Sequence, residues 1–163
     1  MKAQLFFIIS FLIYPANLTF ASDSKAIDEI LNTHFPSNTN IIKTPRGMVA
    51  SFPQDLIFLP NSFELSCNGK KILTKIGYIL SNIDNESTIE GHSESFGKLE
   101  AFEASMIKAD IVRDYITNCY PKLSEKIFSV GLGNFDPQNK VLAEGHPIIE
   151  RIDIVFFAYD AKR

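Results

Sequence analysis

The chain has 163 residues, of which 45% are hydrophobic and 21% are charged, so it can form one domain with an ordinary core and is not a disordered acidic chain. Its formal net charge of −3 at pH 7 argues against nucleic-acid binding and against a basic surface that lies on a membrane. Its two cysteines, Cys67 and Cys119, match no metal motif and are too few for a disulfide scaffold. The sequence leaves open whether they form a disulfide or remain free.

Residues 1–21 are predicted to be a secretory signal peptide. Lys2 gives a positive start, the apolar run LFFIISFLIY follows, and small residues precede the expected cleavage after Ala21. The alternative is a membrane anchor. We prefer cleavage because the run is shorter than the roughly 20 apolar residues that span a bilayer, and because Pro15 and Asn17 interrupt it. Cleavage predicts a protein of the periplasm or cell envelope without a transmembrane segment.

Residues 22–46 are predicted to form a short helix and a linker. Within 24–35, the apolar side chains of Ala26, Ile27, Ile30 and Leu31 recur at helical spacing. Residues 36–47 are rich in Pro, Asn and Gly, which is typical of turns. We therefore expect the domain boundary between residues 46 and 47.

Residues 47–163 show alternating strand and helix patterns. MVASF and DLIFL are β-rich, with Pro53 between them at an edge or a bulge. Helical spacing follows in SCNGKKILTKIGYILSNI and in KLEAFEASMIKADIVRDYITNCY, and strands are expected at STIEG, KIFSVG and RIDIVFFAY. The order β-α-β-α-β-loop-β predicts an α+β sandwich, with two helices packed on a small mixed four-stranded sheet. The buried stripe of the longer helix is expected to contain Leu99, Phe102, Met106, Ala109, Val112 and Ile116.

The sequence contains no recognisable set of catalytic residues. His34, His92 and His146 lack the spacing of a helical zinc motif. The polar segment TIEGHSESFGKLEAF has no nucleophile elbow, and the chain has no phosphate-binding or dinucleotide-binding glycine motif. A hydrolytic pair of His92 and Glu94 is less favoured than a strand end at which the histidine braces a loop. We predict a non-catalytic protein that has no cofactor and no metal.

Five motifs occur in an order that resembles a known family. They are DLIFLPNSFELSCNGKKILTKIGYIL, IEGHSES, ASMIKADIVRDYI, IFSVGLGNFDP and ERIDIVF. Together they make residues 47–159 similar to the OmpA-like peptidoglycan-binding domain, which also occurs in peptidoglycan-associated lipoproteins and flagellar stator proteins. The resemblance implies a domain that holds the diaminopimelate residue of a peptidoglycan stem peptide without a covalent bond.

The resemblance also implies a binding site. Glu94 stands where the family has Asp and would bind the ligand's ammonium, whereas Lys108 stands where the family has Arg and would bind its carboxylate. Arg151 matches the second Arg of the family's last motif and would support the site. Loop residues expected to shape the site are Ser93, Ser95 and Phe96.

Several positions depart from the family pattern. Lys108 lacks the planar two-pronged guanidinium. Ala101 replaces an Asn that braces the loop, and Ile149 and Glu150 replace an Asn and an Arg. Each loss would weaken a desolvated charged contact by about 1–3 kcal/mol, so that together they could make binding negligible.

Two functions remain open from the sequence. The leading hypothesis is an exported cell-envelope protein that binds peptidoglycan, with outer-membrane association left undecided. The alternative is a degenerate domain that acts as a protein-interaction module in an envelope machine, such as a secretion or motility complex. The expected helix at 24–35 and the aromatic residues Phe156, Phe157 and Tyr159, expected to be exposed, motivate the alternative. If Glu94 and Lys108 face one cleft within salt-bridge reach of a common ligand, the first hypothesis gains, and if they point apart, the second does.

Overall fold

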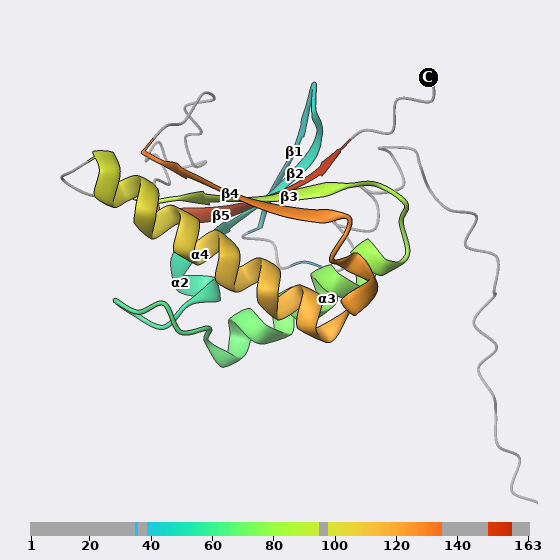
Figure 1. The fold of residues 1–163 in the computed structure, drawn as a ribbon, viewed down its shortest axis with the longest axis horizontal. Helices are drawn as coiled ribbons and strands as arrows, with labels where there is room; N and C mark the ends of the chain where they lie inside the picture. The colour runs from blue at the N-terminus through green and yellow to red at the C-terminus, as the bar shows by residue number, and fades with distance from the viewer. Residues whose placement is uncertain (1–34, 36–38, 95–97, 135–149, 158–163) are drawn as a thin grey trace, which may run out of the picture.

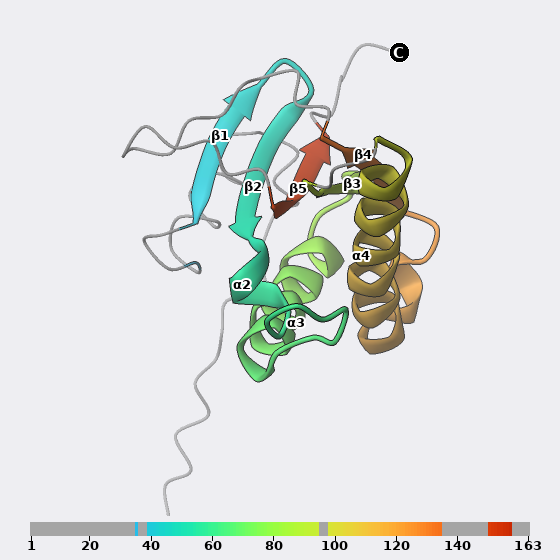
Figure 2. The same cartoon turned by 90° about the vertical axis from the view of Figure 1, so that its left-hand side faces the viewer.

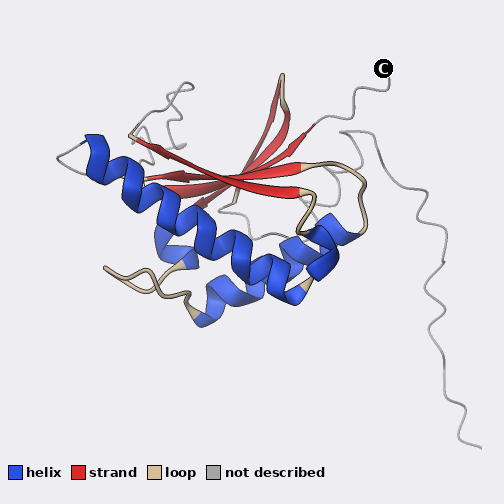
Figure 3. Ribbon diagram, in the orientation of Figure 1, coloured by secondary structure: helices blue, strands red, loops and turns tan. Residues whose placement is uncertain are grey.

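The structure is a computed structural model that describes residue 35 and residues 39–94, 98–134 and 150–157. The predicted signal peptide and nearly all of the predicted N-terminal helix lie outside this part of the chain. The described helices all cover one face of a twisted sheet (Figures 1 and 3). In chain order the elements are β1 (Asn40–Thr44), β2 (Gly47–Pro53), α2 (Gln54–Ile57), α3 (Cys67–Ser81), β3 (Ser87–His92), α4 (Lys98–Cys119), the 3-10 helix η1 (Pro121–Leu123), β4 (Ile127–Gly133) and β5 (Arg151–Phe157).

The sheet contains five strands in the order β1-β2-β5-β3-β4. β3 and β4 are parallel, as expected for strands joined by a crossover helix, here α4, and the other neighbouring pairs are antiparallel. The predicted α+β fold is confirmed, with one strand more than predicted. Residues 40–44, which the sequence placed in the linker, pair with β2 as an edge strand. The turn residues after β1 concealed this short β-prone segment, NIIKT.

The segment DLIFL does not form a strand. Residues 54–57 form the short helix α2, and only Phe58 makes an isolated bridge, to Leu65. Ile57 and Phe58 are fully buried. An apolar run of four residues satisfies burial in either conformation, so its pattern could not distinguish a strand from a helical turn.

The core lies between the sheet and the helices α3 and α4, which run side by side beneath it (Figure 2). β5 occupies the middle of the sheet and directs Ile152, Ile154 and Phe156 into this core. Phe156 was expected to be exposed, but only 1% of its surface is accessible because it alternates with Val155 on a strand that is buried on both faces. Phe157 is half-buried, and Tyr159 lies outside the described residues.

The buried stripe of α4 is shifted from the predicted one. Leu99 and Phe102 are 69% and 48% exposed, whereas the small residues Ala101 and Ser105 are fully buried. From Ala109 onward the prediction is confirmed, since that residue, Val112 and Ile116 are buried. The first turns of α4 therefore face the sheet with small side chains, which a search for large apolar residues overlooks.

Glycines on β3 and β4 explain why α4 needs small residues. A Cβ at Gly91 would lie 2.0 Å from the carbonyl oxygen of Ser105, and one at Gly131 would lie 2.6 Å from the backbone nitrogen of Met106. The Ser105 hydroxyl also accepts a hydrogen bond from the backbone N–H of Gly133 at 2.9 Å. Helix and sheet backbones are therefore in direct contact, and this contact fixes the position of α4 along β3.

We expect Gly91→Ala to destabilise the fold by about 3 kcal/mol or more, because the new methyl group would collide with backbone that cannot rotate away. Chemical denaturation measures the free energy of unfolding. Lys75→Ala, on the exposed face of α3, is the control and should change that free energy by no more than about 0.5 kcal/mol. Equal stability of the Gly91→Ala variant and the wild type would contradict the close packing of α4 on β3.

Candidate functional site

The end of β3 and the middle of α4 together hold the side-chain carboxylate of Glu150. The Ser93 hydroxyl and the backbone N–H of Glu94 donate to Oε1 at 2.9 and 2.8 Å, and Lys108 Nζ donates to Oε2 at 2.7 Å. Glu150 directly precedes β5, whose first residue, Arg151, lies opposite His92 in the sheet. That register brings Glu150 beside the residues that follow β3. Three donors from two separate segments thus converge on one carboxylate.

Lys108 is buried, with 8% of its side chain exposed, and it has polar partners on every side. Besides Glu150, its ammonium donates to Ser93 Oγ at 3.3 Å and to Gln54 Oε1 of α2. An ammonium group has three N–H donors, and each has a partner here. Among the described residues, the Glu150 carboxylate is the counter-charge of this buried ammonium, which makes it necessary to the site.

The protonation of Glu150 follows from the same contacts. Burial alone would raise the pKa of its carboxyl group. The hydrogen bonds from Lys108, the Glu94 backbone and Ser93 outweigh burial and lower the pKa of Glu150 below its ordinary value of 4.5. Glu150 is therefore an anion at neutral pH, and the site is a charge-assisted carboxylate site.

Among the described residues, the side chain of Glu94 makes no hydrogen bond or ion pair with the Glu150 carboxylate. It is exposed, and within the described part of the chain its carboxylate has no hydrogen bond or ion pair. The backbone of Glu94 and the ammonium of Lys108 hold the two oxygens of the same Glu150 carboxylate. The structure thus brings Ser93, Lys108 and the backbone of Glu94 together around one group, and the predicted ligand role of the Glu94 carboxylate stays a prediction. Ser95 and Phe96 lie outside the described residues.

Arg151 belongs to a different cluster, on the face of the sheet away from the helices. Its Nε donates to both carboxylate oxygens of Asp153 at 3.1 Å, and its terminal nitrogen lies 3.3 Å from His92 Nε2. Only 2% of Arg151 is exposed. Its expected support of the ligand site stays a prediction.

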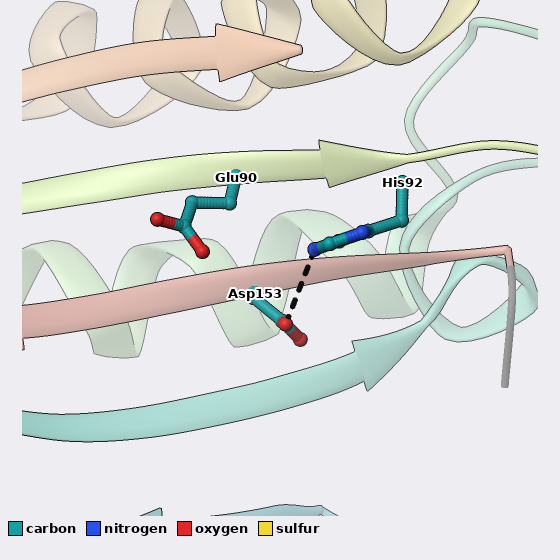
Figure 4. Close-up of side chains that lie close together, drawn as sticks. All are labelled: Glu90, His92 and Asp153. Carbon is teal, nitrogen blue, oxygen red and sulfur yellow. Dashed lines mark ion pairs between the residues drawn. The ribbon is translucent and has the colours of Figure 1, made fainter. Parts of the chain in front are cut away.

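Glu90, His92 and Asp153 place one possible metal-ligand atom each within 4.8 Å of the others, and all three are buried (Figure 4). Arg46, from the turn between β1 and β2, contacts Glu90 through both terminal nitrogens at 2.5 and 3.1 Å. This hydrogen bond raises the pKa of Arg46 despite its partial burial. Two carboxylates thus face two guanidinium groups, from Arg46 and Arg151, and this balance favours an ion-pair network over a metal centre.

The residues that sequence reasoning missed in the carboxylate site are Glu150 and Gln54. From the sequence, Glu150 counted only as the replacement of a family arginine. A buried lysine needs an acidic partner, and Glu150 is that partner here. The sequence signal for this ion pair was that two positions, Lys108 and Glu150, both depart from the family pattern and carry opposite charges. Gln54 carries no signal of its own, because its position depends on the unexpected helix α2. The cysteines, whose pairing the sequence left open, are both free and exposed.

Comparison with known proteins identifies the fold. No protein-family model matches the sequence, and no curated protein matches it. An outer membrane protein from Borrelia burgdorferi is 26% identical, with a TM-score of 0.58 over 75% of this chain and 99% of that chain. The cell wall anchor of the T6SS from Pseudomonas aeruginosa is 17% identical, with a TM-score of 0.63 over 83% and 96% of the two chains. The periplasmic domain of Helicobacter pylori MotB is 13% identical, with a TM-score of 0.61 over 75% and 83%.

These likenesses confirm that the chain has the OmpA-like fold that its motifs resemble. Within the described residues, none of the helices has the length and apolar character needed to cross a membrane.

We expect Arg46→Ala to destabilise the protein by about 1–2 kcal/mol. The change leaves buried Glu90 without its guanidinium, but the loss is smaller than for a fully buried pair because 45% of the Arg46 side chain is exposed. A double-mutant cycle with Glu90→Gln, followed by urea denaturation, should give a coupling energy of about 1 kcal/mol. Additive effects of the two substitutions would show that the pair contributes no stability.

We expect the contribution of Glu150 to the free energy of unfolding to decrease as the pH falls. Its pKa is lower in the folded state, so its contribution is present above its unfolded value of 4.5 and is lost as the pH falls through the folded value. The difference in unfolding free energy between wild type and Glu150→Gln should therefore shrink from pH 7 to pH 3.5. Glu125→Gln, an exposed site at the other end of β4, is the control. A difference that grows on acidification would contradict the assignment.

Proposed function

We propose that this protein is an exported cell-envelope protein whose OmpA-like domain binds peptidoglycan stem peptides without reacting with them. The observation that carries the proposal is the carboxylate site formed by Ser93, the Glu94 backbone and Lys108. A stem peptide ending in diaminopimelate offers a free carboxylate beside an ammonium group. The fold likeness to a cell wall anchor and to an outer membrane protein supports an envelope location.

In the family, the resemblance implies that one arginine binds the ligand carboxylate. In this chain, several groups would share that contact. An arginine would contact both oxygens of a carboxylate through its planar fork. Here Lys108 contacts one oxygen, while Ser93 and the Glu94 N–H contact the other. A two-pronged contact is thus available without a guanidinium. The lysine substitution need not abolish carboxylate binding.

The ammonium of the ligand would bind to the Glu94 carboxylate. This side chain is exposed and lies on the residue whose backbone already contacts the carboxylate site. Ser95 and Phe96 follow in the chain and would complete the surface around the ligand. Arg151 would act indirectly, by holding the start of β5 through Asp153 and His92. All these contacts are non-covalent, so the proposed function requires neither catalysis nor a cofactor.

The proposed location follows from the predicted signal peptide. Cleavage after Ala21 would release the chain into the periplasm. In the periplasm the protein could contact both the peptidoglycan wall and the proteins of an envelope complex.

A protein-interaction module remains the alternative, and one observation favours it. Leu99, Phe102 and Ile107 leave large apolar surfaces exposed on α4, at 69%, 48% and 46%. Exposed apolar side chains on one helix are typical of a protein contact when they form a continuous patch. This alternative predicts that the protein binds an envelope protein and does not bind peptidoglycan.

Co-sedimentation of the purified protein with purified sacculi tests the proposal. We expect binding by the wild type and about a tenfold weaker binding by Glu94→Gln, because the substitution removes the charge that would hold the ammonium. Glu125→Gln makes the same charge change on an exposed residue far from the site and should bind as the wild type does. Failure of the wild type to co-sediment, or equal binding by both variants, would overturn the proposal.

A further inference from the structure

We propose that Glu150 is a ligand built into the chain, and that an external carboxylate enters the site only by displacing its side chain. The existence of this exchange rests on the geometry of the site alone. Only the identity of the natural ligand, a stem-peptide carboxylate, rests on the proposed function. Glu150 would then act as an internal competitor that sets the affinity and the specificity of the site.

The first reason is that the donors of the site are already used. Lys108 directs its three N–H groups to Glu150, Gln54 and Ser93. The Ser93 hydroxyl and the Glu94 N–H both donate to Glu150. An incoming carboxylate would find the donors that hold Glu150 already occupied. A ligand must therefore take the place of one of the present acceptors.

The second reason is that the Glu150 side chain is able to leave. It is 37% exposed, whereas Ser93, which also accepts a hydrogen bond from Lys108, is buried. The Glu150 backbone carbonyl accepts a hydrogen bond from the N–H of Gln54 at 3.1 Å, so the main chain is held at this point. The side chain can thus rotate into solvent without a change in the strand that follows. The donors, in contrast, stay where they are.

The third reason is electrostatic. With Glu150 turned away, the buried ammonium of Lys108 would lack a counter-charge, which is strongly unfavourable. Departure of Glu150 is therefore coupled to arrival of another anion. The process is an exchange of one carboxylate for another, and the site does not stand empty between them.

Specificity follows from this exchange. A simple carboxylate only replaces the contacts that Glu150 made, and it also has to compete with a group held permanently nearby. A ligand that carries an ammonium group gains an additional contact with Glu94, which Glu150 cannot make. The internal competitor thus selects zwitterionic ends over plain carboxylates. In this respect Glu150 is a specificity-determining residue.

Rescue by a small carboxylate tests the exchange without peptidoglycan. We expect Glu150→Ala to have a lower Tm than the wild type at pH 7, and 100 mM sodium acetate to raise it by several degrees relative to sodium chloride of equal ionic strength. The wild type and Glu125→Ala should show no such difference between the two salts. In the Glu150→Ala variant, acetate should also shift the backbone amide resonance of Glu94 with a saturable dependence on concentration.

Glu150→Gln provides a second variant in case the alanine variant does not fold. The amide lacks the charge that pairs with Lys108, so acetate should displace it more readily than it displaces the Glu150 carboxylate and should shift the Glu94 resonance. If acetate stabilises neither variant more than chloride does, and the Glu94 resonance does not respond, the proposed exchange is overturned.

Sacculus binding by the same variants separates this inference from the proposed function. We expect Glu150→Ala to bind sacculi about tenfold more tightly than the wild type, because the competitor is gone. Acetate rescue without sacculus binding by any variant would uphold the exchange and overturn peptidoglycan as the ligand. Acetate rescue with weaker sacculus binding by Glu150→Ala would show that Glu150 assists the ligand, and would overturn its role as a competitor.

Discussion

The antiparallel register between β3 and β5 is the constraint on which both the fold and the site depend. It places Glu90 opposite Asp153 and His92 opposite Arg151. Because side chains alternate along a strand, the same register directs Ile152 and Ile154 toward the helices. A shift of one residue would turn charged groups into the core and apolar groups out of it. The position of Glu150 beside the end of β3 follows from the same pairing.

The register has an electrostatic cost that the surrounding chain offsets. Two carboxylates directly opposite each other on neighbouring strands repel, and both are buried here. Arg46 reaches Glu90 from the β1–β2 turn, and Arg151 contacts Asp153 from within β5. Strand β1, although short and at the edge, is therefore tied to the centre of the sheet by an ion pair as well as by its ladder. The β1–β2 hairpin and the buried charged residues of β3 and β5 thus stabilise each other.

Much of the fold could be predicted from the sequence, whereas the site could be predicted only in part. Long periodic segments gave α3 and β5, since their apolar spacing reflects burial directly. Leu99 and Phe102 were wrongly predicted to be buried, because helix periodicity identifies large apolar side chains. The close approach of α4 to Gly91 requires small side chains instead. The resemblance named Lys108 and Glu94, which the structure places against Glu150, and their binding of a ligand stays a prediction. The site prediction missed the role of Glu150 because a lone acid in a sequence does not reveal which cation it faces.

The departures from the family pattern therefore cannot be added as independent losses. Additivity holds for residues that do not touch, but Lys108 and Glu150 form an ion pair at 2.7 Å and share Ser93 as a partner. A lysine in place of arginine gives up one prong, and Ser93 and the Glu94 N–H supply it. A glutamate in place of arginine removes a positive charge from the site and simultaneously occupies it with a carboxylate. Under the proposed exchange, the site keeps the donors that bind a carboxylate but already holds a carboxylate of its own, which differs physically from a site that has lost those donors.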